Sequence, residues 1–336
     1  MIEHHQPVTV LRSAVAALPN RGFAPRLLDH TVFALSSLAT APLAGRADVV
    51  VVESPPLFLA ASAVPYARTK RARLVLNVSD LWPESAVELG ALTRPRLIGA
   101  AERMARFAYR NANAITVPTE GIAAALERIP EAAGKVHHLP PAVDAGSFRA
   151  DPPRRSGPLR LLYAGTVALA QGLDTLVEAA RIAGPDVVEV TIAGGGMEAS
   201  DLAARVKGGS ISNVKLLGPV APDAVPGLYA RADVGAVLLR DRPIFRGALP
   251  TKLLESMAAA RPVVLSAAGE SARFVDRYGS GAVVAPEEPA ALAEAFLDLR
   301  DMSDQEFGAL SAAARRCAEA HDRTQTVERW LSVLDP

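Results

Sequence analysis

A lysine and a glutamate three residues apart, Lys252 and Glu255, stand near the start of a run of helix formers that follows Pro250 and Thr251. Residues at this spacing share one helix face, so the ammonium and the carboxylate are expected side by side. We expect Thr251 to cap the helix. A helix N-terminus presents free N–H groups and a partial positive charge, which suit a phosphate. This combination fits a nucleoside diphosphate, with its phosphates at the helix tip and its ribose beside the acid.

The same residues also fit a plain capped surface helix. A Lys–Glu pair at this spacing stabilises an exposed helix by roughly 0.2–0.5 kcal/mol and needs no ligand. From these residues alone both interpretations stay open. A loop that contains Arg246 precedes the helix, and Pro262 with the apolar run 263–265 follows it, which predicts a helix stop and a buried strand.

The stretch LPTKLLESMAAARPVV resembles the PSKLxExMAAGxPVV segment of the retaining glycosyltransferases of family 4. Members of that family have the GT-B fold, which consists of two Rossmann-like domains. In the family, the glutamate binds the ribose of the sugar nucleotide, and the lysine and helix tip bind its diphosphate. The resemblance therefore implies a ribose role for Glu255. It implies a diphosphate role for Lys252 and for the amides near Leu253 and Leu254.

A second segment of the chain, from Tyr163 to Leu173, places Gly165 and Thr166 at the end of a predicted strand. Phosphorylated ligands bind at this end of α/β sheets, although any strand-to-helix turn favours glycine. The segment resembles the family pattern YxGxxxxxKGxxxLxxA, whose basic residue holds the diphosphate. Here Gln171 stands in that position, as in members that transfer amino-deoxy sugars. We expect Arg246 to supply the missing cation.

Two further loops extend the resemblance. Gly194 lies in a glycine run after another predicted strand and resembles the family's xGxG turn, while Val220 follows a segment whose loop contacts the nucleobase. Many members carry a first glutamate eight residues before the ribose ligand, where this chain has Gly247. That acid normally lies near the donor sugar, so either the sugar is held differently or Arg246 and the loop backbone substitute for the acid.

In the first half of the chain, Asp80, Trp82 and Glu84 follow a predicted strand in the string NVSDLWPES. Two acids around an aromatic residue at a strand's carboxyl end would face a cleft between domains. The alternative is a tryptophan plug with a helix-capping aspartate. DLWPES resembles the fucosamine-transferase-like branch of surface-polysaccharide enzymes, although the histidine common in the family is Ser79 here. The resemblance implies that Asp80 contacts the acceptor hydroxyl or the donor sugar, and that Glu84 contacts the acceptor.

Short apolar strands alternate with helices through both halves of the chain, which predicts doubly wound parallel sheets. With the resemblance, this predicts an α/β protein of the GT-B fold, with two Rossmann-like domains facing a cleft. Residues 1–150 are expected to form the acceptor-side domain and 157–320 the nucleotide-sugar domain. Residues 321–336 are expected to form a helix that crosses back to the first domain. The predicted strands are 8–11, 48–53, 74–78, 114–117, 136–139, 159–164, 188–193, 214–217, 234–238, 263–265 and 282–284.

The front of the chain lacks the strand, Gly-rich loop and long helix that open family members. We therefore expect the N-terminal βα unit to be missing, which would expose a sheet edge and apolar helix faces. Poor solubility or low activity is the expected consequence.

The composition excludes several other classes of protein. The formal net charge of zero over 336 residues argues against a nucleic-acid binder. The single cysteine, Cys317, excludes an internal disulfide and a cysteine-based metal cluster, and the six histidines lack metal-ligand spacing. We therefore expect no metal or other cofactor. The sequence has neither a run of 18 uncharged apolar residues nor a signal peptide, so a cytoplasmic location is expected.

The first half of the chain is slightly basic, because residues 1–150 carry 16 Lys and Arg against 12 Asp and Glu. One interpretation is a solvated basic helix. The other is shallow docking to an anionic membrane at the inner face of the plasma membrane, which would suit a lipid-linked acceptor. The residues concerned are Arg94, Arg96, Arg103, Arg106 and Arg110, beside apolar Leu97, Ile98, Met104 and Phe107.

Together these features predict a retaining glycosyltransferase of cell-surface polysaccharide biosynthesis. Its donor would be a nucleotide sugar, UDP-linked, and its acceptor a polysaccharide or a lipid-linked glycan. Two alternatives stay open. One is a nucleotide-sugar 2-epimerase on the same fold, which needs no acceptor. The other is a non-catalytic remnant that binds nucleotide only.

Overall fold

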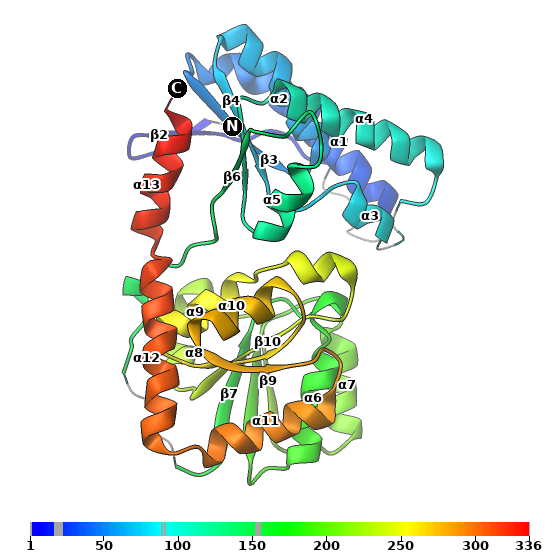
Figure 1. Cartoon of the computed structure of the whole chain (residues 1–336). Coiled ribbons are helices and arrows are strands. Elements are labelled where there is room, and N and C mark those ends of the chain that lie inside the picture. Colours follow the sequence, from blue (N-terminus) through cyan, green and yellow to red (C-terminus); the bar gives the residue numbers. More distant parts are fainter. Residues whose placement is uncertain (1, 17–22, 89, 91, 152–155, 336) are drawn as a thin grey trace. The chain divides into compact units, whose positions relative to one another are not determined.

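The computed structural model describes residues 2–16, 23–88, 90, 92–151 and 156–335. They form two compact units, Met1–Leu139 with Glu328–Pro336, and Pro140–Val327 (Figure 1). Among the helices that the structure describes, none is both long and apolar enough to cross a bilayer.

The second unit is built on a six-stranded parallel sheet, in the order β12-β11-β10-β7-β8-β9. The strand order reverses between β7 and β10, which makes the carboxyl end of β7 the point where such sheets bind ligands. The central strands β7, β10 and β11 are almost wholly buried, whereas the edge strands β9 and β12 are mostly half-buried. Their bounds are β7 Leu159–Ala164, β8 Val188–Ala193, β9 Val214–Gly218, β10 Val234–Leu238, β11 Val263–Ser266 and β12 Gly281–Val284.

Helices cover both faces of this sheet. Leucines, valines and alanines of α6 (Leu173–Ala183) and α11 (Pro289–Asp301) pack on one face. The other face is covered by α8 (Val225–Tyr229), α9 (Thr251–Ala258) and α10 (Glu270–Tyr278). The unit also contains α7 (Ala199–Gly208), α12 (Asp304–Ala320) and the 3-10 turns Ala145–Ser147, Leu169–Gln171, Pro222–Ala224 and Pro243–Gly247.

Helix α9 ends in a backbone motif that usually needs glycine. The N–H of Ala260 donates to the carbonyl of Met257, and that of Arg261 to the carbonyl of Ser256, as in a Schellman motif. Ala260 accordingly has a φ of 55°, in the left-handed region. The family segment MAAGxPVV has glycine here, so this chain places a strained alanine at the helix end.

The first unit has a four-stranded parallel sheet in the order β3-β4-β5-β6, with no reversal among the described strands. Helices α2, α4 and α5 pack on one face through an aliphatic cluster. The bounds are β3 Val49–Ser54, β4 Arg73–Val78, β5 Ala114–Val117 and β6 Val136–His138, with α1 Phe23–Thr40, a 3-10 turn Ala41–Ala44, α2 Leu57–Lys70, α3 Glu84–Glu88, α4 Pro95–Asn111 and α5 Glu120–Leu126. An antiparallel pair, β1 (Ile2–His5) and β2 (Val8–Leu11), precedes them.

Helix α13 (Arg323–Leu334) begins in the second unit and ends in the first. Its last turns pack Val333, with Trp330 beside it, on residues of β4 and β5 in the first unit. Apolar surface stays exposed nearby. Within the described residues β3 lies at the sheet edge with Val51 half exposed, and Leu35 on α1 is 64% exposed. Whether this exposed surface lowers the solubility of the chain remains a prediction.

Candidate functional site

A pocket of about 530 Å³ opens at the carboxyl ends of β7 and β8, beside the start of α9. Most residues expected to bind the donor line it, although they come from five separate segments of the chain. The lining residues are Ala164, Gly165, Thr166, Gln171, Ala193, Gly194, Gly195, Pro219, Val220, Pro222, Val225, Pro250, Thr251, Lys252 and Glu255.

Two glycine loops form one wall of the pocket. Gly165 and Gly194 both have a φ of 151°, which L side chains rarely adopt. The N–H of Gly165 donates to the carbonyl of Ala193 at 2.9 Å, and the N–H of Gly194 to that of Gly218 at 2.8 Å. A Cβ on Gly194 would lie 1.7 Å from the carbonyl oxygen of Gly165. The loops therefore pack backbone against backbone, and glycine is required whether or not a ligand is bound.

The ammonium of Lys252 lies against the first glycine loop. Its Nζ donates to the hydroxyl of Tyr163 at 2.7 Å and lies 4.1 Å from the centroid of that ring. A Cβ on Gly165 would be only 2.8 Å from Nζ. Burial lowers the pKa of Lys252 to about 8, although the nearby Glu255 carboxylate acts in the opposite direction. At neutral pH this side chain supplies a positive charge that is partly removed from water.

Glu255, one turn further along α9, lines the same pocket. Burial raises the pKa of this carboxyl group, and the Lys252 ammonium partly offsets the shift. A half-buried carboxylate at a pocket wall is a strong acceptor for ligand hydroxyl groups. The spacing predicted from the sequence therefore places an acid and a base on the same pocket wall.

The start of α9 differs from the expectation in one detail. Thr251 is the first helical residue and Pro250 takes the cap position, so the prediction of a threonine cap was wrong. The fixed φ of proline, here −64°, suits the turn into the helix, and no side chain caps the helix from the N-cap position. The side chains of Leu253 and Leu254 are fully buried, which leaves only their amides for a ligand. The Leu253 amide already donates to the Pro250 carbonyl at 3.0 Å.

Gln171 and Arg246 have different surroundings. Gln171 lines the pocket, and its Oε1 is buried without a hydrogen-bond partner among the described residues. Arg246 is not among the lining residues, and its guanidinium pairs with Asp241 at 3.0 Å. The expectation that Arg246 replaces the missing cation at Gln171 therefore stays a prediction, and the structure gives it no contact with the pocket.

From the sequence, no role was assigned to Arg240, whose side chain binds residues on both sides of Gln171. Its Nε donates to the carbonyl of Leu169 at 2.8 Å. Its two terminal nitrogens pair with Asp174 and Glu287, both at 2.9 Å. A single arginine thus joins three segments beside the pocket. No local pattern in the sequence indicates such long-range pairing.

Asp80 and Glu84 belong to the first unit. Asp80 follows β4 and is half-buried, and burial raises the pKa of its carboxyl group against opposing hydrogen bonds from Ser85 and the Leu81 amide. Glu84 is exposed and opens the short helix α3. Asp80 therefore has the environment of a group whose proton affinity has been raised, and Glu84 is exposed to solvent.

Within the described residues, no group of three His, Cys, Asp or Glu side chains is close enough to hold a metal ion. Cys317 is buried in an apolar cluster, and burial raises the pKa of its thiol to about 12. The cysteine therefore serves in packing rather than in thiolate chemistry.

Comparison with known proteins assigns both units. Residues 158–301 match the family described as "Glycosyl transferases group 1", and residues 3–142 match "Glycosyl transferase 4-like domain". A curated relative is the GDP-mannose-dependent alpha-(1-6)-phosphatidylinositol monomannoside mannosyltransferase of Mycobacterium tuberculosis. It is 30% identical over 217 residues, which cover 60% of this chain and 55% of the relative. The chain thus matches about half the length of that relative.

Solved structures share the fold over nearly the whole chain. Sucrose-phosphate synthase from Thermosynechococcus elongatus gives a TM-score of 0.78 at 18% identity, covering 99% of this chain and 84% of that one. The Anabaena protein HepE in complex with UDP gives 0.72 at 16% identity, covering 94% and 84%. The predicted GT-B fold is therefore confirmed. Both halves of the chain therefore match glycosyltransferase family models, each over a little less than half of the chain, on a GT-B fold.

Proposed function

We propose that this chain transfers a hexose derivative, with retention, from a nucleoside-diphosphate sugar to a polysaccharide or lipid-linked acceptor in cell-surface polysaccharide assembly. The observation that carries the proposal is the pairing of Lys252 and Glu255 in one pocket with the two glycine loops. UDP is the nucleotide that we propose, in line with the sequence. GDP is the alternative because the curated relative is named as GDP-mannose-dependent.

The pocket suggests a role for each donor-side residue. Glu255 accepts hydrogen bonds from the ribose hydroxyls, and Val220 lies beside the base. Lys252, the first amides of α9 and the Gly165–Thr166 loop hold the diphosphate, where a cation and oriented dipoles stabilise the charge of the leaving group. The unpartnered Oε1 of Gln171 accepts from a ligand hydroxyl or N–H.

On the first unit we assign Asp80 to the acceptor hydroxyl or the donor sugar, and Glu84 to the acceptor. The raised pKa of Asp80 supports this role, because a carboxylate with a higher proton affinity is a better acceptor for a reacting hydroxyl. The fucosamine-transferase-like branch remains our proposal for the kind of sugar transferred, and rests on DLWPES and Gln171.

Calorimetric titration of the full chain with UDP, GDP and ADP tests the donor site. We expect one nucleotide to bind, and Glu255→Ala to weaken that binding by about 1–3 kcal/mol, roughly 5- to 150-fold, because a charged hydrogen-bond acceptor is lost. A matched control is Glu294→Ala, which removes an exposed glutamate of α11 outside the pocket. If Glu255 binds the ribose, the 2′-deoxyribose form of the nucleotide should bind the parent chain weakly. Its affinity should then fall little further in Glu255→Ala, because the hydroxyl that Glu255 would bind is already absent.

The outcomes separate the alternatives. Absence of binding to all three nucleotides would contradict the donor site itself. Release of sugar product from the donor without an acceptor would favour the 2-epimerase. Tight binding with no turnover on any acceptor would favour a non-catalytic remnant, to which Gln171 and Gly247 also point.

The affinity for the diphosphate should fall as the pH rises through about 8. Below that pH Lys252 is an ammonium, and above it the free site holds a neutral amine. A bound diphosphate favours the charged form and raises this pKa, so binding near pH 8.5 should take up protons. Calorimetry in buffers of different ionisation enthalpy measures the uptake. The nucleoside without phosphates is the control and should show none; equal uptake for both ligands would exclude Lys252 as its source.

A basic face of α4 fits an anionic membrane surface. Arg96, Arg103 and Phe107 are exposed and recur at helical spacing, and Leu97 beside them is 45% exposed. We expect the chain to sediment with phosphatidylglycerol vesicles, and Arg96→Glu with Arg103→Glu to weaken binding roughly tenfold or more. Charge reversal of two exposed arginines of the second unit is the control. Absence of binding to anionic vesicles would contradict the docking.

A further inference from the structure

The hydroxyl of Tyr163 joins the two parts of the pocket that would hold phosphate. Tyr163 lies near the end of β7 and is fully buried. Its O–H donates to the carbonyl of Thr166 at 2.6 Å, and the same oxygen accepts from Nζ of Lys252 at 2.7 Å. Thr166 belongs to the first glycine loop and Lys252 to α9. One hydroxyl group therefore fixes the distance between a loop and a helix that are far apart in sequence.

The ammonium is held on more than one side. Nζ lies 4.1 Å from the centroid of the Tyr163 ring, within the range of a cation–π contact. It also approaches Gly165 so closely that a Cβ there would lie 2.8 Å away. Burial raises the pKa of the Tyr163 hydroxyl, so the group keeps its proton at neutral pH and can serve the Thr166 carbonyl as a donor. Its oxygen is then oriented to accept from the lysine.

A free lysine side chain is a flexible four-carbon stem, and fixing it at a ligand costs rotamer entropy. A charge-assisted hydrogen bond within the empty pocket removes part of that cost in advance. We propose that Tyr163 is a positioning residue of the donor site, which holds the Lys252 ammonium against the Gly165–Thr166 loop at the place where the donor's diphosphate binds. The part of this proposal that concerns the donor's diphosphate rests on the proposed function, whereas the contact that holds the Lys252 ammonium does not.

The test compares Tyr163→Phe with the parent chain for UDP and GDP and for the matching nucleosides. We expect the diphosphate to bind about tenfold more weakly and the nucleoside to bind unchanged, because only the phosphate end loses its support. Tyr66→Phe, the same change in the first unit, is the control. A simple packing defect would weaken nucleoside and diphosphate alike, and that result would overturn the proposal.

A double-mutant cycle with Lys252→Met shows whether the tyrosine acts through the lysine. Once Lys252 is replaced, Tyr163→Phe should cause no further loss of diphosphate affinity. If the two losses multiply instead, the hydroxyl acts independently of the ammonium, and the positioning role is wrong.

A second readout needs no nucleotide. We expect acetic anhydride at pH 7 to acylate Lys252 several-fold faster in Tyr163→Phe, since the amine loses its acceptor and its pKa falls further. The other groups that face this lysine, Glu255 on α9 and Tyr229 on α8, are unchanged. Exposed Lys207 is the internal control. An unchanged rate of Lys252 acylation would contradict the proposal that the Tyr163 hydroxyl holds the Lys252 ammonium.

The two readouts distinguish failure of the proposed function from failure of this inference. If the parent chain binds no nucleotide, the proposed donor role is wrong. The rate of Lys252 acylation still shows whether Tyr163 holds the Lys252 ammonium. If Tyr163→Phe does not fold, 3-fluorotyrosine at the same position keeps the packing and weakens the acceptor. The labelling of Lys252 should then rise in the same direction, and no rise would contradict the proposal.

Discussion

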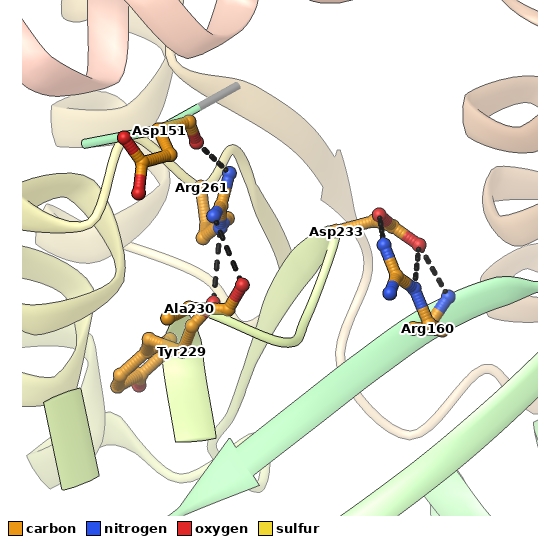
Figure 2. Close-up of polar contacts among 6 residues, drawn as sticks. All are labelled: Asp151, Arg160, Tyr229, Ala230, Asp233 and Arg261. Carbon is orange, nitrogen blue, oxygen red and sulfur yellow. Dashed lines mark hydrogen bonds and ion pairs between the residues drawn. The ribbon is translucent and has the colours of Figure 1, made fainter. Parts of the chain in front are cut away.

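Replacing Arg261 with methionine is expected to lower the free energy of unfolding by about 3 kcal/mol. Arg261 is 1% exposed, and its guanidinium donates to the carbonyls of Asp151, Tyr229 and Ala230, the first at 2.7 Å and the second at 3.0 Å. Figure 2 shows the side chain between these segments, with the separate Arg160–Asp233 pair to its right. Methionine fills a similar volume but removes all three donated hydrogen bonds, and the Tyr229 carbonyl then keeps only the bond from the Ala232 N–H at 3.1 Å.

Urea denaturation of the full chain measures the effect, and hydrogen exchange at Tyr229 and Ala230 locates it. Arg231→Met removes an exposed arginine a short distance away and should change stability by no more than about 0.5 kcal/mol. Arg261→Lys keeps a charge but has a single amine, so it should recover only part of the loss. Equal stability of Arg261→Met and the parent would show that water satisfies the exposed carbonyls.

Such an anchor is invisible in the sequence. From the sequence alone, an arginine before Pro262 is interpreted as an exposed loop residue, and the family pattern allows any residue at the position of Arg261. Its partners are carbonyl groups 31, 32 and 110 residues away, so the contact depends on the tertiary fold alone. The contact between Lys252 and Tyr163 spans 89 residues and could not be predicted for the same reason.

The elements that could be predicted are those with strong periodicity. The runs 159–164, 188–193 and 234–238 are short and mostly apolar, the last two with β-branched residues, and each forms a strand with those bounds. Strand β1, Ile2–His5, was not predicted, because its sequence IEHH shows no alternation of apolar and polar residues. The strand depends on its pairing with β2.

The site could be predicted as far as local spacing reaches. Lys252 and Glu255 line the same pocket because three residues separate neighbours on a helix face. The side chain of Arg246 was harder to place, because a 3-10 turn lets it reach Asp241 instead of the pocket. Loop geometry of this kind has no periodicity from which to predict side-chain direction.

Gly194→Ala should reduce nucleotide affinity by more than about 100-fold and lower the free energy of unfolding by roughly 3 kcal/mol. The added Cβ would lie 1.7 Å from the carbonyl oxygen of Gly165, which is main chain and cannot rotate away. The two loops must separate, which disrupts the hydrogen bonds from Gly194 to Gly218 and from Gly165 to Ala193. The same movement carries the Gly165 loop away from Lys252.

The loss of affinity is measured by calorimetry with the nucleotide that binds the parent chain. The loss of stability is measured by urea denaturation. Gly208→Ala is the matched control, because a Cβ there meets no atom within 4 Å at the end of α7, and this variant should bind nucleotide like the parent chain.

Gly195→Ala separates two explanations of why this loop needs glycine, since its Cβ would meet the Pro219 side chain at 2.8 Å rather than main chain. If close approach of a ligand is what requires glycine in this loop, Gly195→Ala should lose affinity with little loss of stability. If backbone packing is the requirement, only Gly194→Ala should lose both, and wild-type affinity in Gly194→Ala would contradict either explanation.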